Sequence, residues 1–111
     1  MVGGVGLASL ACYLSQYLGI PLPRDIIFLG KVECRGKLRH SLPVSKHYLD
    51  FCLEEGFTRI VGPSSDMNTL GGLATDPRYQ GIILTGLNNA LEIVTEVFQP
   101  LRPVDEGEGL Q

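Results

Sequence analysis

The stretch PLPRDIIFLGKVECRGKLR, residues 21–39, decides the fold class of this chain. Its apolar run IIFL, at residues 26–29, has the length of a short buried strand, and Gly30 interrupts that run. From residue 31 to residue 39, charged and small or apolar residues alternate. This alternation predicts one half-exposed strand with a mostly basic outer face. Within that strand, Gly36 marks a bulge or a turn.

Apolar residues recur at helical spacing on both sides of this stretch. Residues 5–18 carry an apolar stripe that ends before Gly19, and Ser45 can cap a second predicted helix at residues 46–55. A third amphipathic helix is predicted over residues 88–98. The inward-facing residues are Leu7, Leu10, Ala11, Leu14, Tyr17 and Leu18 in the first helix, Tyr48, Leu49, Phe51 and Cys52 in the second, and Leu87, Ala90, Leu91, Val94, Val97 and Phe98 in or just before the third.

Two further apolar runs, at residues 57–61 and 81–84, predict short strands. Residues 62–80 between them are polar and glycine-rich, so we expect a long functional or mobile loop there. The order of elements predicts an α/β fold, with helices packed on a small mixed sheet in an α+β two-layer arrangement. Strand 31–38, helix 46–55 and the strand after it could form a right-handed crossover unit.

The composition limits the possible function classes. The 111 residues include 9 Lys+Arg and 12 Asp+Glu, the net charge is −3, and 44% of residues are apolar. These values exclude a wholly disordered chain, and no apolar run approaches the roughly 18 residues of a membrane span. The first basic residue is Arg24, so a secretion signal with a basic start is not indicated. We therefore expect an intracellular protein, cytoplasmic, or organellar if its source is eukaryotic.

The three cysteines, Cys12, Cys34 and Cys52, form no C-x-x-C pair and lie among apolar residues. This pattern favours reduced, buried thiols. Only His40 and His47 could join them as metal ligands, so we expect no metal site and no cofactor.

A serine–lysine arrangement is one candidate for chemistry. Lys46 begins a predicted helix beside His47, with Ser41 and Ser45 upstream. A lysine acts as a general base only when it is desolvated, and the sequence gives no sign of desolvation. A solvated lysine at a helix start is the favoured interpretation.

The glycines before the first helix are a second candidate. Backbone N–H groups at a helix start attract anions, and Gly3, Gly4 and Gly6 would allow an anion to approach. No phosphate-binding motif accompanies them, however, so turning and close packing of the backbone explain them better.

A basic strip is the third candidate, since six of the nine basic residues lie between residues 24 and 46. Lys31, Arg35, Lys37 and Arg39 fall on one face of the predicted strand, where they could neutralise phosphates. A solvated outer face that resists edge aggregation explains the same pattern equally well.

The motifs P-L-P-R-D at residues 21–25, Phe28-x-Gly30 and G-F-T-R at residues 56–59 resemble the Lon proteolytic domain and its relatives. The resemblance covers about residues 5–98, which is the C-terminal half of such a domain. It implies a partial ribosomal-protein-S5-domain-2-like fold, with residues 1–99 as the partial domain and residues 100–111 as an acidic, disordered tail. In Lon peptidases a serine and a lysine form the catalytic dyad. The alignment puts Gly4 at the serine position and Lys46 at the lysine position, so it implies a chain without a nucleophile.

Within this family, the chain looks closer to the non-catalytic Lon-like C-terminal domain of the DNA repair protein RadA (Sms). The segment G-K-L-R at residues 36–39 and the start V-G-G-V carry that resemblance, although Lys31 replaces the usual acidic residue and the zinc and Walker A motifs of RadA are absent. The resemblance implies a scaffold or oligomerisation domain that contacts DNA, here through Lys31, Arg35, Lys37 and Arg39.

The implied partners are a second copy, or a chain that supplies the missing N-terminal strands or an ATPase, and DNA; no membrane is implied. Two alternatives stay open. One is a Ser–Lys peptidase that uses Ser9, Ser41 or Ser45, and the other is a protein-interaction module without a ligand.

Overall fold

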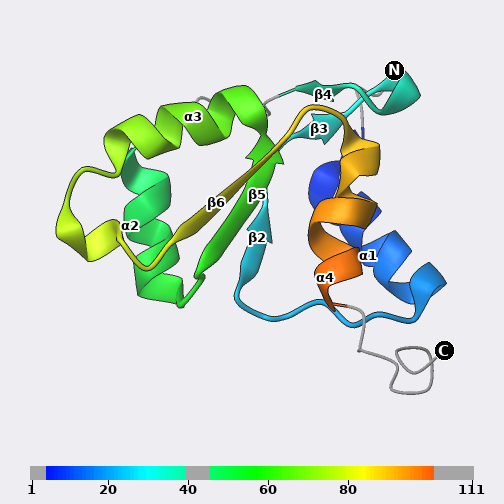
Figure 1. Ribbon diagram of the computed structural model, residues 1–111, viewed down its shortest axis with the longest axis horizontal. Helices are drawn as coiled ribbons and strands as arrows, with labels where there is room; N and C mark the ends of the chain where they lie inside the picture. Colours follow the sequence, from blue (N-terminus) through cyan, green and yellow to red (C-terminus); the bar gives the residue numbers. More distant parts are fainter. Residues whose placement is uncertain (1–4, 40–45, 102–111) are drawn as a thin grey trace, which may run out of the picture.

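The computed structural model describes residues 5–39 and 46–101. Six strands form two three-stranded sheets, ordered β1-β3-β4 and β2-β5-β6 (Figure 1). The first sheet is antiparallel and the second is parallel. The strands are β1 (Val5–Gly6), β2 (Ile26–Phe28), β3 (Lys31–Val32), β4 (Leu38–Arg39), β5 (Arg59–Pro63) and β6 (Ile83–Leu87).

Three regular helices and a wound C-terminal segment accompany the sheets. The regular helices are α1 (Leu7–Leu18), α2 (Lys46–Glu55) and α3 (Ser64–Leu73), and short 3₁₀ turns η1 (Cys34–Gly36) and η2 (Pro77–Tyr79) lie in the connections. The C-terminal segment consists of the 3₁₀ turn η3 (Ala90–Glu92), the π-helical turn η4 (Val94–Phe98) and α4 (Gln99–Leu101). The protein is thus of the mixed α/β class with a small parallel sheet.

Helices cover both faces of the parallel sheet, so the expected two-layer arrangement is wrong. Figure 1 shows α2 and α3 on one side of the sheet and α1 and α4 on the other. Consecutive side chains of the central strand β5 point to opposite faces of the sheet, because side chains alternate across a strand. Ile60 is buried against α2 and α3, and Val61 is buried against α1 and the C-terminal segment.

Each side has its own apolar core. The α1-side core contains the buried residues Leu7, Ala11, Ile20, Val61, Leu87, Ala90, Ile93, Val97 and Phe98. The α2-side core contains Leu49, Cys52, Ile60, Met67, Leu70 and Tyr79.

The connection predicted as a long loop at residues 62–80 is mostly ordered, and that prediction is wrong. It contains the helix α3 and the turn η2. Met67 and Leu70 are buried against the sheet and Tyr79 fills the α2-side core. Three widely spaced apolar residues suffice to anchor the segment, but they are too few to produce a helical pattern in the sequence.

The crossover unit also differs from the prediction. Strands β2 and β5 pair in parallel, and the connection between them contains residues 31–39, which belong to the other sheet, and then helix α2. The two later strands begin and end about two residues after their predicted positions.

Several residues predicted to face inward are exposed. Tyr17 on α1 is 74% exposed, and Leu91 and Val94 in the C-terminal segment are exposed as well. The segment opens with a 3₁₀ turn, in which residues three apart share a face, so Ile93 rather than Leu91 follows Ala90 into the core. The C-terminal segment continues past the helix predicted over residues 88–98 and ends at Leu101, and residues 102–111 of the expected tail lie outside the described residues.

The bounds of the second helix agree with the prediction, and so does the glycine that ends the first helix. Phe51 of α2 was expected to face inward but is 44% exposed. Ser45, expected to cap this helix, lies outside the described residues. Gly19 ends α1 in the left-handed conformation, with φ 69°, and Gly56 follows α2 with φ 81°. No helix among the described residues is long and apolar enough to cross a membrane.

Candidate nucleic-acid interface

Strands β3 and β4 form a hairpin, not the single strand that alternation predicted. Lys31 lies opposite Arg39 and Val32 lies opposite Leu38. Paired residues of a hairpin point to the same face, so the alternation of charged and apolar residues continues through the turn. This is why the pattern indicated the exposed basic residues although it predicted one continuous strand. The turn falls at Gly36, where a bulge or a turn was expected.

The turn at the hairpin tip requires left-handed backbone at two consecutive residues. Arg35 has φ 62° and Gly36 has φ 77°, and the Lys37 N–H donates to the Cys34 carbonyl at 3.4 Å. Val32 pairs with Leu38, so the loop between the strands has an odd number of residues and is centred on Arg35. The left-handed backbone of Arg35 and Gly36 lets the chain reverse direction there.

Asn89 fixes the hairpin tip to the C-terminal segment. Its Nδ2 donates to the carbonyl of Arg35 at 3.0 Å, and its Oδ1 accepts from the Leu91 N–H at 2.8 Å. A Cβ on Gly36 would lie 2.5 Å from the same Oδ1. The tip is therefore held in one position relative to the α1-side core.

Gly30 joins β2 to the hairpin at a position where only glycine fits. Its φ is +108°, and a Cβ there would lie 3.0 Å from the ring of Pro63 and 3.1 Å from the carbonyl oxygen of Arg39. Its own carbonyl accepts from the Leu7 N–H at 2.9 Å. The hairpin base thus packs directly against β5 and the start of α1.

The hairpin divides into an apolar inner face and a basic outer face. Val32 and Leu38 pack against the α1-side core, and the side chains of the four basic residues are exposed. The structure brings all four predicted contact residues together on this one hairpin: Lys31, Arg35, Lys37 and Arg39. We call them the basic face.

One acidic residue offsets part of this charge. Glu33 accepts a 2.8 Å hydrogen bond from Nη1 of Arg39, in an ion pair whose side chains are 28% and 65% exposed. Lys31 and Arg39 remain directly opposite each other, and like charges in that position destabilise a hairpin. An anionic partner bound here would relieve that repulsion.

A pocket of about 320 Å³ adjoins the basic face. It is lined by Leu38 and Arg39 of the hairpin and by Pro63 and Ser65 where β5 passes into α3. It offers a guanidinium and a hydroxyl group to a polar ligand group.

The residues of the predicted Ser–Lys arrangement are described only in part. Lys46 is the first residue of α2, and Ser9 is exposed on α1. Gly4, Ser41 and Ser45 lie outside the described residues, as does the position of the Lys46 side chain. The peptidase alternative therefore stays a prediction.

The prediction of three buried thiols is wrong for two of them. Cys12 and Cys34 are exposed, whereas Cys52 is buried in the α2-side core, where burial raises the pKa of its thiol. Cys34 lies at the hairpin turn, so its side chain is exposed although apolar residues are near it in the sequence. Among residues 5–39 and 46–101, no three His, Cys, Asp or Glu side chains cluster as metal ligands would.

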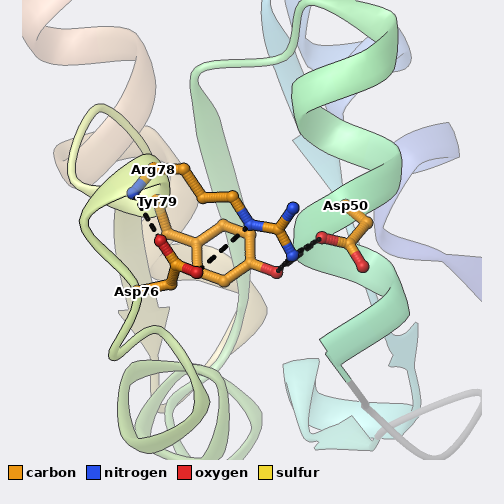
Figure 2. A network of polar contacts seen from close by, with 4 residues as sticks. All are labelled: Asp50, Asp76, Arg78 and Tyr79. Carbon is orange, nitrogen blue, oxygen red and sulfur yellow. Dashed lines mark hydrogen bonds and ion pairs between the residues drawn. The ribbon is translucent and has the colours of Figure 1, made fainter.

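One polar network was not apparent from the sequence (Figure 2). The Tyr79 hydroxyl donates to Asp50 at 2.5 Å and accepts from Nη2 of Arg78 at 2.8 Å, while Arg78 also pairs with Asp50 at 3.1 Å and with Asp76 at 3.6 Å. Burial, followed by the hydrogen bond to Asp50, raises the pKa of Tyr79. The network ties the turn η2 to helix α2, so its role is to hold the α2-side core together. Asp50 lies 26 to 29 positions before the other three residues, and no local pattern links it to them.

The basic face and the polar network thus lie in different parts of the fold. No protein-family model matches this chain, and no curated protein matches it either. The geometry of the basic face is therefore what carries the functional argument.

Proposed function

We propose that this chain is a non-catalytic, Lon-like scaffold module, related to the domain found in RadA, with a partial S5-domain-2-like fold. Its task is to bind the phosphate backbone of nucleic acid through the basic face. The carrying observation is that four exposed basic side chains share one hairpin, with Lys31 directly opposite Arg39.

Three structural features support phosphate binding over a merely solvated surface. A tight turn, Gly30 and Asn89 hold the hairpin in place, so little backbone entropy is lost when a ligand binds. The basic side chains face solvent, and among the described residues Arg39 alone of the four is ion-paired, with Glu33. The adjoining pocket can admit one phosphate beside Arg39 and Ser65.

Phosphate contacts provide affinity without sequence readout, and the affinity falls steeply with salt. The face presents four cations, so we expect weak duplex binding that weakens with a log–log salt slope of about −3 to −4. The net charge of −3 confines this binding to the hairpin side of the molecule.

The test is fluorescence anisotropy with a labelled DNA duplex over a range of salt concentrations. Changing Lys31, Lys37 and Arg39 together to Ala should abolish binding, and Lys37→Ala alone should reduce the salt slope by about one. Arg24→Ala is the matched control, because Arg24 is equally exposed but lies outside the hairpin. Absence of binding at the lowest salt, or equal loss in Arg24→Ala and Lys37→Ala, would refute the proposal.

A further inference from the structure

Strand β2 has an open outer edge. It lies at one end of the order β2-β5-β6, and no other strand among the described residues pairs with it. Asp25 and Leu29 bond towards β5 through their backbones, so the alternation of a strand turns the N–H and C=O groups of Ile26 and Phe28 outward. Those groups can accept one more strand.

An apolar pocket lies beside this edge. It has a volume of about 310 Å³ and is lined by Ile27 of β2 and by His47, Tyr48 and Phe51 of α2. Phe51 is 44% exposed although its ring lies 6.0 Å from that of Phe57. A strand edge with an adjoining apolar pocket is the arrangement used when one protein adds a strand to another.

The charges on α2 run against its helix dipole. Lys46 and His47 occupy its first turn, and Glu54 and Glu55 occupy its last turn, where they are exposed. Basic groups at a helix start and acidic groups at its end are unfavourable in an isolated helix. The natural complement is another helix with the same charge order that runs antiparallel to it.

We propose that a second copy of this chain covers the β2–α2 surface about a two-fold axis. The two β2 strands pair antiparallel and are centred on Ile27, so that Ile26 of each copy lies opposite Phe28 of the other. Each such pair exchanges two backbone hydrogen bonds. The two parallel sheets then form one continuous sheet across the axis.

The same axis sets the two α2 helices antiparallel. With Phe51 at the centre, His47 of one copy lies opposite Glu55 of the other, and each Phe51 ring enters the apolar pocket of the opposite copy. A two-fold contact uses the same patch twice, so it must be self-complementary. The β2–α2 surface meets that condition in its strand edge, its apolar pocket and its charges.

The first test compares two exposed apolar residues at opposite edges of the parallel sheet. Phe51→Glu should raise the dimer dissociation constant about a hundredfold or more, measured by sedimentation equilibrium, because it puts a charge into each pocket. Ile83→Glu, at the β6 edge, is the matched control, since Ile83 is 59% exposed and should leave the dimer unchanged. A chain that remains monomeric at about 0.5 mM, or a dimer that Ile83→Glu breaks and Phe51→Glu does not, overturns the proposal.

The second test separates assembly from folding. Glu55→Lys should stabilise each α2 helix, because its charge then agrees with the dipole, yet weaken the dimer about threefold to thirtyfold. Adding His47→Glu in the same chain exchanges the charges of the His47–Glu55 pair and should restore the dimer. If Glu55→Lys leaves dimerisation unchanged, or if the double variant stays as weak as the single one, the antiparallel α2 contact is wrong.

This inference does not rest on DNA binding. Variants of the basic face should dimerise normally, and Phe51→Glu should keep the salt slope of one basic face in the anisotropy assay. Failure of one proposal is therefore visible without failure of the other.

Discussion

The basic face and the β2–α2 surface make opposite demands on a partner. The first is charged, exposed and built on a two-stranded hairpin, whereas the second is apolar and has an open strand edge. Each nevertheless contains an arrangement that is unfavourable in the isolated chain. Lys31 faces Arg39 across the hairpin, and the charges of α2 oppose its dipole. We propose that such an electrostatic misfit marks a binding surface in this chain, and that the kind of misfit indicates the partner.

The largest expected effect on stability comes from a substitution at the base of the hairpin. Gly30→Ala should destabilise the protein by about 2–4 kcal/mol, because a Cβ meets Pro63 and the Arg39 carbonyl at a φ that disfavours side chains. Chemical denaturation measures this change, and DNA binding should fall with it. Gly72→Ala is the control, since nothing lies near its Cβ in helix α3, and it should stabilise the protein by up to about 1 kcal/mol. Equal stability of the two variants would show that Gly30 does not hold the hairpin base.

The next effect concerns the α2 side alone. Tyr79→Phe removes the hydrogen bonds to Asp50 and Arg78 and should cost about 1–2 kcal/mol, while DNA binding stays unchanged. Tyr17→Phe, on the exposed face of α1, should change stability by less than about 0.5 kcal/mol. An equal loss of stability in Tyr17→Phe would show that the network does not stabilise the α2-side core.

The same tyrosine gives a pH dependence with a definite sign. Its pKa is raised in the folded state above the ordinary tyrosine value of about 10, so the folded state holds the proton more tightly than the unfolded state. The resulting stability is fully present below about pH 10 and is lost as the pH rises through the folded-state pKa. Denaturation curves above pH 10 should show this loss in the original protein and not in Tyr79→Phe. Parallel curves for the two proteins would contradict it.

A smaller effect is expected at the hairpin tip. Asn89→Ala removes the hydrogen bond to the Arg35 carbonyl and the cap of η3, and should cost about 1 kcal/mol. DNA affinity should fall a few fold because the tip loses its support, whereas dimerisation should not change. Asn68→Ala, on the exposed side of α3, is the control. A change in dimerisation would mean that the two surfaces are coupled.

The last prediction concerns the thiols, whose modification should change stability least. Cys34 and Cys52 differ sharply in exposure. A thiol reagent should modify Cys34 at the hairpin quickly and Cys52 on α2 only when the protein unfolds. Cys12→Ser removes the other exposed thiol, so that mass spectrometry then follows one fast and one slow site. Two fast sites would show that the α2-side core opens readily.

Much of the secondary structure followed from local pattern. The helices α1 and α2, with their glycine ends, and the strands near residues 26, 59 and 83 were predicted within a few residues. The exposure of the four basic residues agrees with the sequence pattern, and Lys31 and Arg39 pair across the hairpin. Their role in binding stays a prediction. Helix α3 and the Tyr79 network were missed, since each depends on contacts between distant segments.

What the sequence by itself determined is which residues alternate, which are charged and where glycine permits a turn. These are properties of a residue and its neighbours, and they suffice to define the basic face. The tertiary structure alone decided that Lys31 meets Arg39, that Tyr79 reaches Asp50 and that β2 lies at an open edge beside Phe51. The physical reason is that strand pairing and burial join residues far apart in the chain, whose partners no local pattern specifies.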